Sequence, residues 1–145
     1  KAFEYDEARR LVKYFYDTLA YMKLEKLCNP EFNFEVNILN EVRYIQVPPL
    51  LFMPIIEYAV RKEVENEEGT EKHIAIRFQE KEEGLLFTCV YRCMEADTRQ
   101  RMSQTPVPAL DQLQKRLELL YPGHYLLENQ YDHQSSCTTS LKLMQ

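Results

Sequence analysis

Three prolines stand within fourteen mostly apolar residues, in the segment VPPLLFMPIIEYAV from Val47 to Val60. Proline interrupts helices and sheets, because it lacks an amide hydrogen and its ring clashes with the preceding turn. Pro48 and Pro49 fit the first turn of a helix, where amide donors have no intrahelical partner. The apolar composition argues against a surface loop. The segment therefore predicts a buried turn, a kink, and a helix of about three turns from Pro54 to Val64.

Periodicity along the rest of the chain predicts a small set of further elements. Apolar residues at spacings of three and four predict helices over residues 5–27 and 107–121. Strands are expected where apolar and polar residues alternate, namely 32–38, a hairpin over 73–93, 124–132 and 137–144. The order α-β-α-β-β-loop-α-β-β favours an α+β two-layer sandwich, with helices on one face of a mixed β-sheet.

The first predicted helix carries two kinds of apolar surface. Its main stripe, which includes Met22 and Leu27, is expected to pack in the core. Tyr14, Tyr16 and Tyr21 lie off that stripe and add an aromatic surface. We expect part of this helix to pack on a partner.

Length and charge limit the function classes. The 145 residues suit a single domain spanning 1–145, and a chain that starts at Lys1 is expected to be an excised fragment. The net charge of −5 and the lack of a basic stripe argue against nucleic-acid binding. No apolar run approaches the ~20 residues of a membrane span.

The cysteine spacing gives one candidate metal set, Cys89 and Cys93 with His133 and Cys137. Four residues of a strand span ~13 Å, whereas two thiolates on one zinc ion each lie ~2.3 Å from it. A bend after Arg92 would be needed to bring them together. We therefore expect no metal site and favour free thiols in a reducing cytoplasm.

The proline segment VPPLLFMPIIEYAVRKE (Val47–Glu63) resembles a segment close to V-P-P-L-L-L-Q-P-L-V-E-N-A-I-K-H-G in LytS-like sensor histidine kinases. VPALDQLQKRLELLYPG (Val107–Gly123) and SSCTTSLKL (Ser135–Leu143) are similar to later segments of that family, in the same order. LEKLCNPEFNFEV (Leu24–Val36) resembles its link from the dimerisation helices. The resemblance covers nearly the whole chain and implies the GHKL (Bergerat) ATP-binding sandwich.

In that family the domain binds Mg–ATP and phosphorylates a histidine on a separate helical hairpin. Residues 1–30 are then expected to form an N-terminal helix that continues from a missing dimerisation and phosphoacceptor region. The implied partners are the protein's own dimerisation hairpin or a second copy, and a LytTR-type response regulator. The implied location is a cytoplasmic domain of an inner-membrane parent, with membrane contact only through the missing N-terminal region.

The residues that handle nucleotide in the family are replaced here. The Mg²⁺-binding Asn falls on Tyr58, whose neutral phenol is a poor substitute for an amide oxygen. The preceding Glu57 is kept and is a candidate catalytic base. The Asp that reads adenine falls on Arg92, which has donors and no acceptor. The next motif's Asn falls on Gln112.

The glycines of the family motifs fall on other residues, and the whole chain has three glycines. Backbone that closely approaches phosphate needs glycine. The expected site is therefore degenerate, and the residues that mark it are Tyr58, Lys62, Arg92, Gln112, Thr138 and Thr139. Neither ATP nor Mg²⁺ is expected to bind.

The interpretation favoured by the sequence is a pseudokinase module of a two-component sensor histidine kinase, acting in signal transduction. One alternative is an active autokinase that holds nucleotide unconventionally, with Arg92 or Lys62 on phosphate and Glu57 as the base. The other alternative is a non-kinase interaction module on the same fold.

Overall fold

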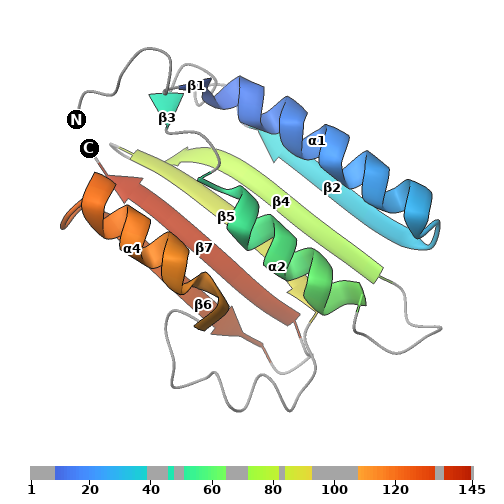
Figure 1. Cartoon of the computed structure of the whole chain (residues 1–145). Helices are drawn as coiled ribbons and strands as arrows, with labels where there is room; N and C mark the ends of the chain where they lie inside the picture. The colour runs from blue at the N-terminus through green and yellow to red at the C-terminus, as the bar shows by residue number, and fades with distance from the viewer. Residues whose placement is uncertain are drawn as a thin grey trace.

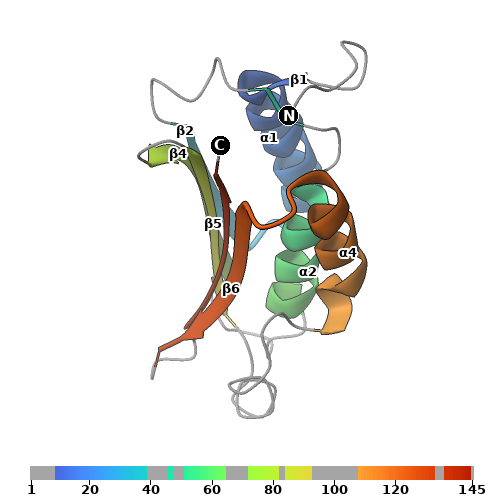
Figure 2. The ribbon, with the colours of Figure 1, turned by 90° about the vertical axis from the view of Figure 1, so that its left-hand side faces the viewer.

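A five-stranded sheet with helices against one face forms the main body of the chain (Figures 1 and 2). The computed structural model describes residues 9–38, 46–47, 51–64, 72–81, 84–92, 108–132 and 136–144. The helical elements are α1 (Leu11–Cys28), α2 (Met53–Val64), the short 3-10 turn η2 (Pro108–Leu110) and α4 (Asp111–Leu120). The strands of the sheet are β2 (Phe32–Ile38), β4 (Lys72–Lys81), β5 (Gly84–Arg92), β6 (Tyr125–Tyr131) and β7 (Ser136–Met144).

The strand order is β2-β4-β5-β7-β6. β2 runs parallel to β4, and the other three pairings are antiparallel, so the sheet is mixed as predicted. A parallel pair needs a crossover connection, and α2 lies between β2 and β4 in the chain. The two-residue strands β1 (Arg9–Arg10) and β3 (Gln46–Val47), which the sequence did not predict, pair antiparallel in a separate small sheet.

The proline-rich segment forms the helix that the sequence predicted from Pro54 to Val64, whereas the turn predicted at Pro48 and Pro49 lies outside the described residues. Pro54 is the second residue of α2, where its missing amide hydrogen removes no helical hydrogen bond. Before it, the carbonyl oxygen of Phe52 accepts hydrogen bonds from the amides of Ile55 and Ile56, at 3.1 and 3.2 Å. The expected apolar face is buried, with every member at most 5% exposed: Ile55, Ile56, Ala59 and Val60.

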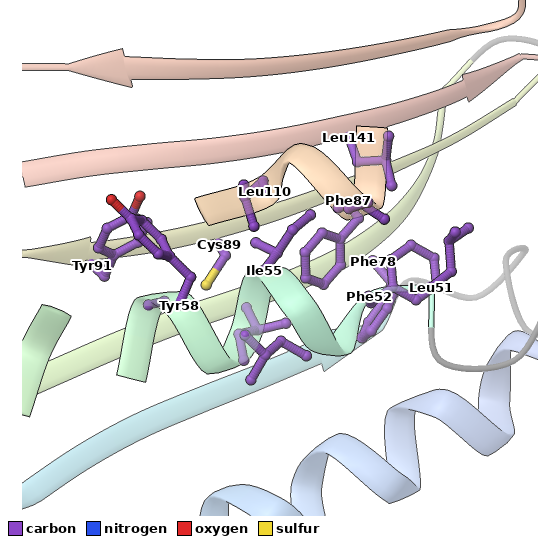
Figure 3. Packing of buried hydrophobic residues seen from close by; sticks show 14 of the residues in the cluster. Leu51, Phe52, Ile55, Tyr58, Phe78, Phe87, Cys89, Tyr91, Leu110 and Leu141 are labelled. Atoms are coloured by element: carbon purple, nitrogen blue, oxygen red, sulfur yellow. The ribbon is translucent and has the colours of Figure 1, made fainter. Parts of the chain in front are cut away.

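Aromatic rings hold the start of α2 against the middle of the sheet (Figure 3). The Phe52 ring lies 5.3 Å from that of Phe78 on β4 and 4.8 Å from that of Phe87 on β5, measured between centroids. All three side chains are at most 1% exposed. Buried aromatic pairs of this kind add roughly 0.5–1.5 kcal/mol beyond their area burial. The contacts fix the rest of α2 over the far end of β5.

Near the far end of β5, strand alternation decides which of the two faces of the sheet each side chain belongs to. On β5 the buried side chains are Leu85, Phe87, Cys89 and Tyr91, and on β7 they are Cys137, Thr139, Leu141 and Leu143. Side chains alternate across a strand, so these residues face the helices. Arg92 and Thr138 therefore belong to the opposite face, and Arg92 is exposed there.

The first helix differs from its prediction in two ways. It begins at Leu11 rather than residue 5, and residues 5–8 lie outside the described part of the chain. Met22 is fully buried as expected, but Leu27 is 78% exposed, so its assignment to the core stripe was wrong. Five residues separate the two, which turns Leu27 by ~140° around the helix. The buried neighbour of Met22 is instead Thr18, at 2% exposure.

The helix predicted over residues 107–121 is split. Residues Pro108–Leu110 form η2, and α4 follows as far as Leu120. Leu110, Leu113 and Leu117 are at most 3% exposed, which confirms this stripe as core. Figure 2 shows α2 and α4 side by side on one face of the sheet, as predicted.

The cysteines do not all match the expectation of free thiols. Cys28 and Cys89 are free, whereas Cys137 is disulfide-bonded to a partner outside the described residues. The prediction of free thiols was therefore wrong for Cys137. Among the described residues, no helix is long and apolar enough to span a membrane.

Candidate functional site

The candidate site lies between α2 and the adjoining ends of β5 and β7. Tyr58 of α2 is 4% exposed, and its ring packs edge to face on the ring of Tyr91 at the end of β5. The centroids are 5.9 Å apart and the planes meet at 90°. Figure 3 shows the two tyrosines together at one end of the buried cluster. The position that the resemblance gives to a metal ligand thus holds a buried aromatic pair.

A chain of hydrogen bonds runs from this pair across the sheet. The Thr139 hydroxyl donates to Oδ1 of Asn129 on β6, at 2.6 Å. A threonine hydroxyl has one proton, so the Tyr91 hydroxyl must donate to Thr139 Oγ1, at 2.8 Å. Thr139 is fully buried, and the Asn129 Nδ2 atom is buried without a partner among the described residues. Burial is the main cause that raises the pKa of Tyr91 to about 12, so the phenol stays protonated as this donor.

Two cations lie beside the Tyr58 ring. The Arg61 guanidinium carbon and the Lys62 ammonium nitrogen are each 5.6 Å from the ring centroid. Lys62 is 8% exposed, so its charge is held within the protein. A cation near an aromatic face is attracted by the ring quadrupole. The surroundings of Tyr58 therefore already hold positive charge.

A buried carboxylate ties α2 to the ends of two strands. Glu63 is 1% exposed, and its carboxylate accepts the backbone N–H groups of His73, at 3.2 Å, and of Arg92. Burial raises the Glu63 pKa above its ordinary value, while the two backbone hydrogen bonds and the charges of Arg92 and Lys72 oppose that rise. Both carboxylate oxygens are thus used to fix the ends of β4 and β5.

The structure brings together only some of the residues that the sequence predicted. Tyr58, Lys62 and Thr139 lie in or beside the buried cluster. The side chains of Arg92 and Thr138 belong to the opposite face of the sheet, and the hydrogen bond of Arg92 to the site comes from its backbone N–H. Gln112 is exposed on the first turn of α4.

The candidate base Glu57 lies apart from this cluster. It is exposed on α2 and close to Tyr21 of α1. The Tyr21 pKa is raised to about 12. Burial is the largest cause, followed by the charge of Glu25, a hydrogen bond to Glu25 and the charge of Glu57. Glu57 therefore belongs to the surface between α1 and α2.

Three residues of the site were missed from the sequence: Tyr91, Asn129 and Glu63. For Tyr91 the signal was present, because alternation from Phe87 and Cys89 puts it on the helix face. Nothing local indicates Glu63, whose partner Arg92 is 29 residues away.

The described surroundings of Tyr58 are aromatic and cationic rather than rich in oxygen ligands. Within the described part of the chain, no three His, Cys, Asp or Glu side chains are grouped to hold a metal ion. Magnesium prefers carboxylate, amide and water oxygens. Around Tyr58 the structure instead supplies an aromatic pair and two cations.

Comparison with known proteins gives a fold and no close relative. No protein-family model and no curated protein matches the chain. The solved catalytic domain of histidine kinase ThkA matches with a TM-score of 0.64 at 8% identity, over 94% of this chain and 93% of that chain. The histidine kinase domain of an Erythrobacter litoralis blue-light activated histidine kinase matches with 0.66 at 11% identity, over 99% and 69%.

A third match is the crystal structure of ThkA in complex with the response regulator TrrA, with a TM-score of 0.61 at 8% identity. It covers 94% of this chain and 40% of that chain. At such identities the likeness shows the fold alone. The chain has the α+β fold of histidine kinase catalytic domains, which confirms the fold that the resemblance implied.

Proposed function

We propose that this chain, which has the fold of histidine kinase catalytic domains, is a pseudokinase module of a LytS-like bacterial two-component sensor kinase. Its nucleotide site is degenerate, and it transmits a signal through contacts rather than through phosphoryl transfer. The observation that carries the proposal is the buried Tyr58–Tyr91 pair, because the resemblance gives the position of Tyr58 to the metal ligand.

The first support is electrostatic. A bound Mg²⁺ needs oxygen ligands and is repelled by neighbouring cations. Arg61 and Lys62 hold two positive charges beside the Tyr58 ring, and the phenol that replaces the amide is neutral. A divalent ion at this place would meet like charge, and the Tyr58 side chain offers it no amide oxygen.

The second support concerns adenine. The amino group of adenine is a donor and needs an acceptor. The helix-facing side chain at the end of β5 is Tyr91, whose neutral phenol oxygen is a weaker acceptor than the carboxylate of an aspartate. The nearby buried carboxylate of Glu63 accepts two backbone N–H groups. Burying the adenine amino group without a good acceptor would cost about 1–3 kcal/mol of binding free energy. Each 1.4 kcal/mol weakens nucleotide binding tenfold.

The proposed biological setting follows from the resemblance and from the solved ThkA complex with TrrA. The partners are a response regulator, of the LytTR type, and the dimerisation hairpin of the same protein. The module is then a cytoplasmic domain of an inner-membrane parent.

Calorimetric titration of the chain with Mg–ATP tests the proposal. We expect no saturable heat at micromolar nucleotide. The informative variant is Arg92→Asp, and the matched control is Arg77→Asp, because Arg77 is an exposed arginine on the adjacent strand β4. Micromolar binding that Arg92→Asp weakens and Arg77→Asp leaves unchanged would establish an unconventional working site and overturn the pseudokinase proposal.

A further inference from the structure

An apolar stripe runs along the side of α1 that faces away from the sheet. It consists of Tyr16 at 61% exposure, Leu24 at 62% and Leu27 at 78%, together with exposed Ala20. The buried residues Thr18 and Met22 lie on the opposite side of the same helix. Figure 1 shows α1 at the margin of the molecule, over β2. We call this exposed surface, within the described part of the chain, the α1 stripe.

The spacing of the stripe suits another helix. Residues 16, 20, 24 and 27 follow one another at intervals of four and three, which keeps them on one side of a helix over about three turns. The three intervals average about 3.67 residues, close to the ~3.6 residues of one turn, so the row runs nearly straight along α1 and a second helix can lie along it. Single exposed leucines are ordinary on a protein surface, but a continuous row at helical spacing is a candidate interface.

One cation lies within this row. Lys23 is exposed on the same side of α1, and the described residues give it no carboxylate partner. The neighbouring Lys26 is differently placed, because its ammonium donates to the carbonyl oxygens of Pro30, at 3.2 Å, and Phe32, at 2.8 Å. A charge that becomes buried in an interface needs an opposite charge. The occupant of the α1 stripe must therefore bring an acid to Lys23.

A second copy of the chain does not meet this requirement. In an antiparallel pair of identical helices each flank meets the same flank of the other copy, so Lys23 would face Lys23 and Lys26. In a parallel pair, Lys23 of one copy would face the other flank of α1 in the second copy, near Tyr21 and Leu24. That part of α1 has no acidic residue on this flank. The nearest acid on that flank, Asp17, is six residues away, or ~9 Å along the axis.

From these observations we propose that the α1 stripe docks an amphipathic helix of a partner protein, whose apolar seam is flanked by acidic residues that pair with Lys23. The stripe supplies the apolar contact area, and Lys23 sets which helices fit. The site is separate from the Tyr58–Tyr91 cluster, so it does not depend on whether nucleotide binds.

Two synthetic helical peptides test the charge requirement. They share one leucine seam, and the flank that meets Lys23 carries glutamates in the first peptide and lysines in the second. Binding to the whole chain is measured by fluorescence anisotropy. The acidic peptide is expected to bind more tightly, although the chain's net charge of −5 favours the basic one at long range. The Lys23→Glu variant is expected to reverse the preference.

A matched pair of leucine variants tests the apolar part. Leu24→Gln is expected to weaken binding of the acidic peptide by about tenfold or more, the size of one lost leucine contact. Leu119→Gln is the control, because Leu119 is 77% exposed on α4 and outside the stripe. Equal binding of both peptides, no binding of either, or a chain dimer in sedimentation that Leu24→Gln abolishes would each overturn the proposal.

Discussion

The substitution Thr139→Val probes the hydrogen-bond chain that fills the candidate site. Valine has nearly the shape of threonine, so the change removes the hydroxyl while leaving the packing in place. Thr139 is fully buried, and its hydroxyl is the only link between Tyr91 and Asn129 that the described residues provide. The variant leaves the Tyr91 phenol without an acceptor and Asn129 Oδ1 without a donor.

The size of the effect follows from burial. Tyr91 is 4% exposed, so its unpaired hydroxyl is expected to cost about 1–3 kcal/mol. Asn129 is only partly buried, so its loss of a donor is expected to add less. Tyr91→Phe removes the donor itself, and Thr139 keeps its bond to Asn129. That change is expected to cost only about 0.5–1.5 kcal/mol.

Urea unfolding of the two single variants and the double variant measures these costs. In the double variant no phenol is left unpaired, so its cost should fall short of the sum of the single costs by about 1 kcal/mol. Thr88→Val is the matched control, because Thr88 lies on β5 with its side chain on the opposite face of the sheet. A Thr139→Val cost no larger than that of Thr88→Val, or strictly additive costs, would refute the reasoning.

Three further predictions concern packing and titration. Leu117→Ala should lower the free energy of unfolding by about 2–5 kcal/mol, because Leu117 is fully buried. Leu119→Ala, on the exposed side of the same helix, should change it by less than about 0.5 kcal/mol. Similar costs of the two variants in urea unfolding would be evidence against the packing of α4. Gly84→Ala should cost about 1–3 kcal/mol, since the added carbon would lie 2.0 Å from the Leu143 carbonyl oxygen, and a neutral result would contradict the close pairing of β5 with β7. Burial raises the Glu63 pKa above its ordinary 4.5, so the stability that this group contributes is full below pH 4.5 and is lost as pH rises through the raised value. The free energy of unfolding of the wild type relative to Glu63→Gln should therefore fall over that pH range. A difference that rises with pH would show that the Glu63 pKa is lowered instead.

The elements of this fold could be predicted because each leaves a local pattern. Pro54 marks the start of α2, and alternation marks each of the five strands of the main sheet. Helix faces were harder to predict. Leu27 follows the spacing from which a core stripe was predicted, yet it is exposed. The reason is that α1 has apolar residues on two sides, and the sequence pattern cannot say which side meets β2.

The site was predicted only in part, for a similar reason. Tyr58 and Thr139 were identified through the resemblance, and both lie in the buried cluster. Arg92 was assigned by counting along a motif, whereas the pleat of β5 gives the helix-facing place to Tyr91. Glu63 was missed, because its hydrogen bonds to the ends of two strands exist only after the sheet has formed.

The central claim is that tyrosine side chains fill the place where the family holds nucleotide. Amide chemical shifts of the labelled chain, followed by NMR while Mg–ATP is added, test it residue by residue. The account predicts no saturable shift at Tyr58, Tyr91 or Thr139 up to about 1 mM nucleotide, a concentration at which even a weak site of −4.1 kcal/mol would be half filled. Saturable shifts grouped on these three residues would mean that nucleotide enters the cluster, and would contradict the account.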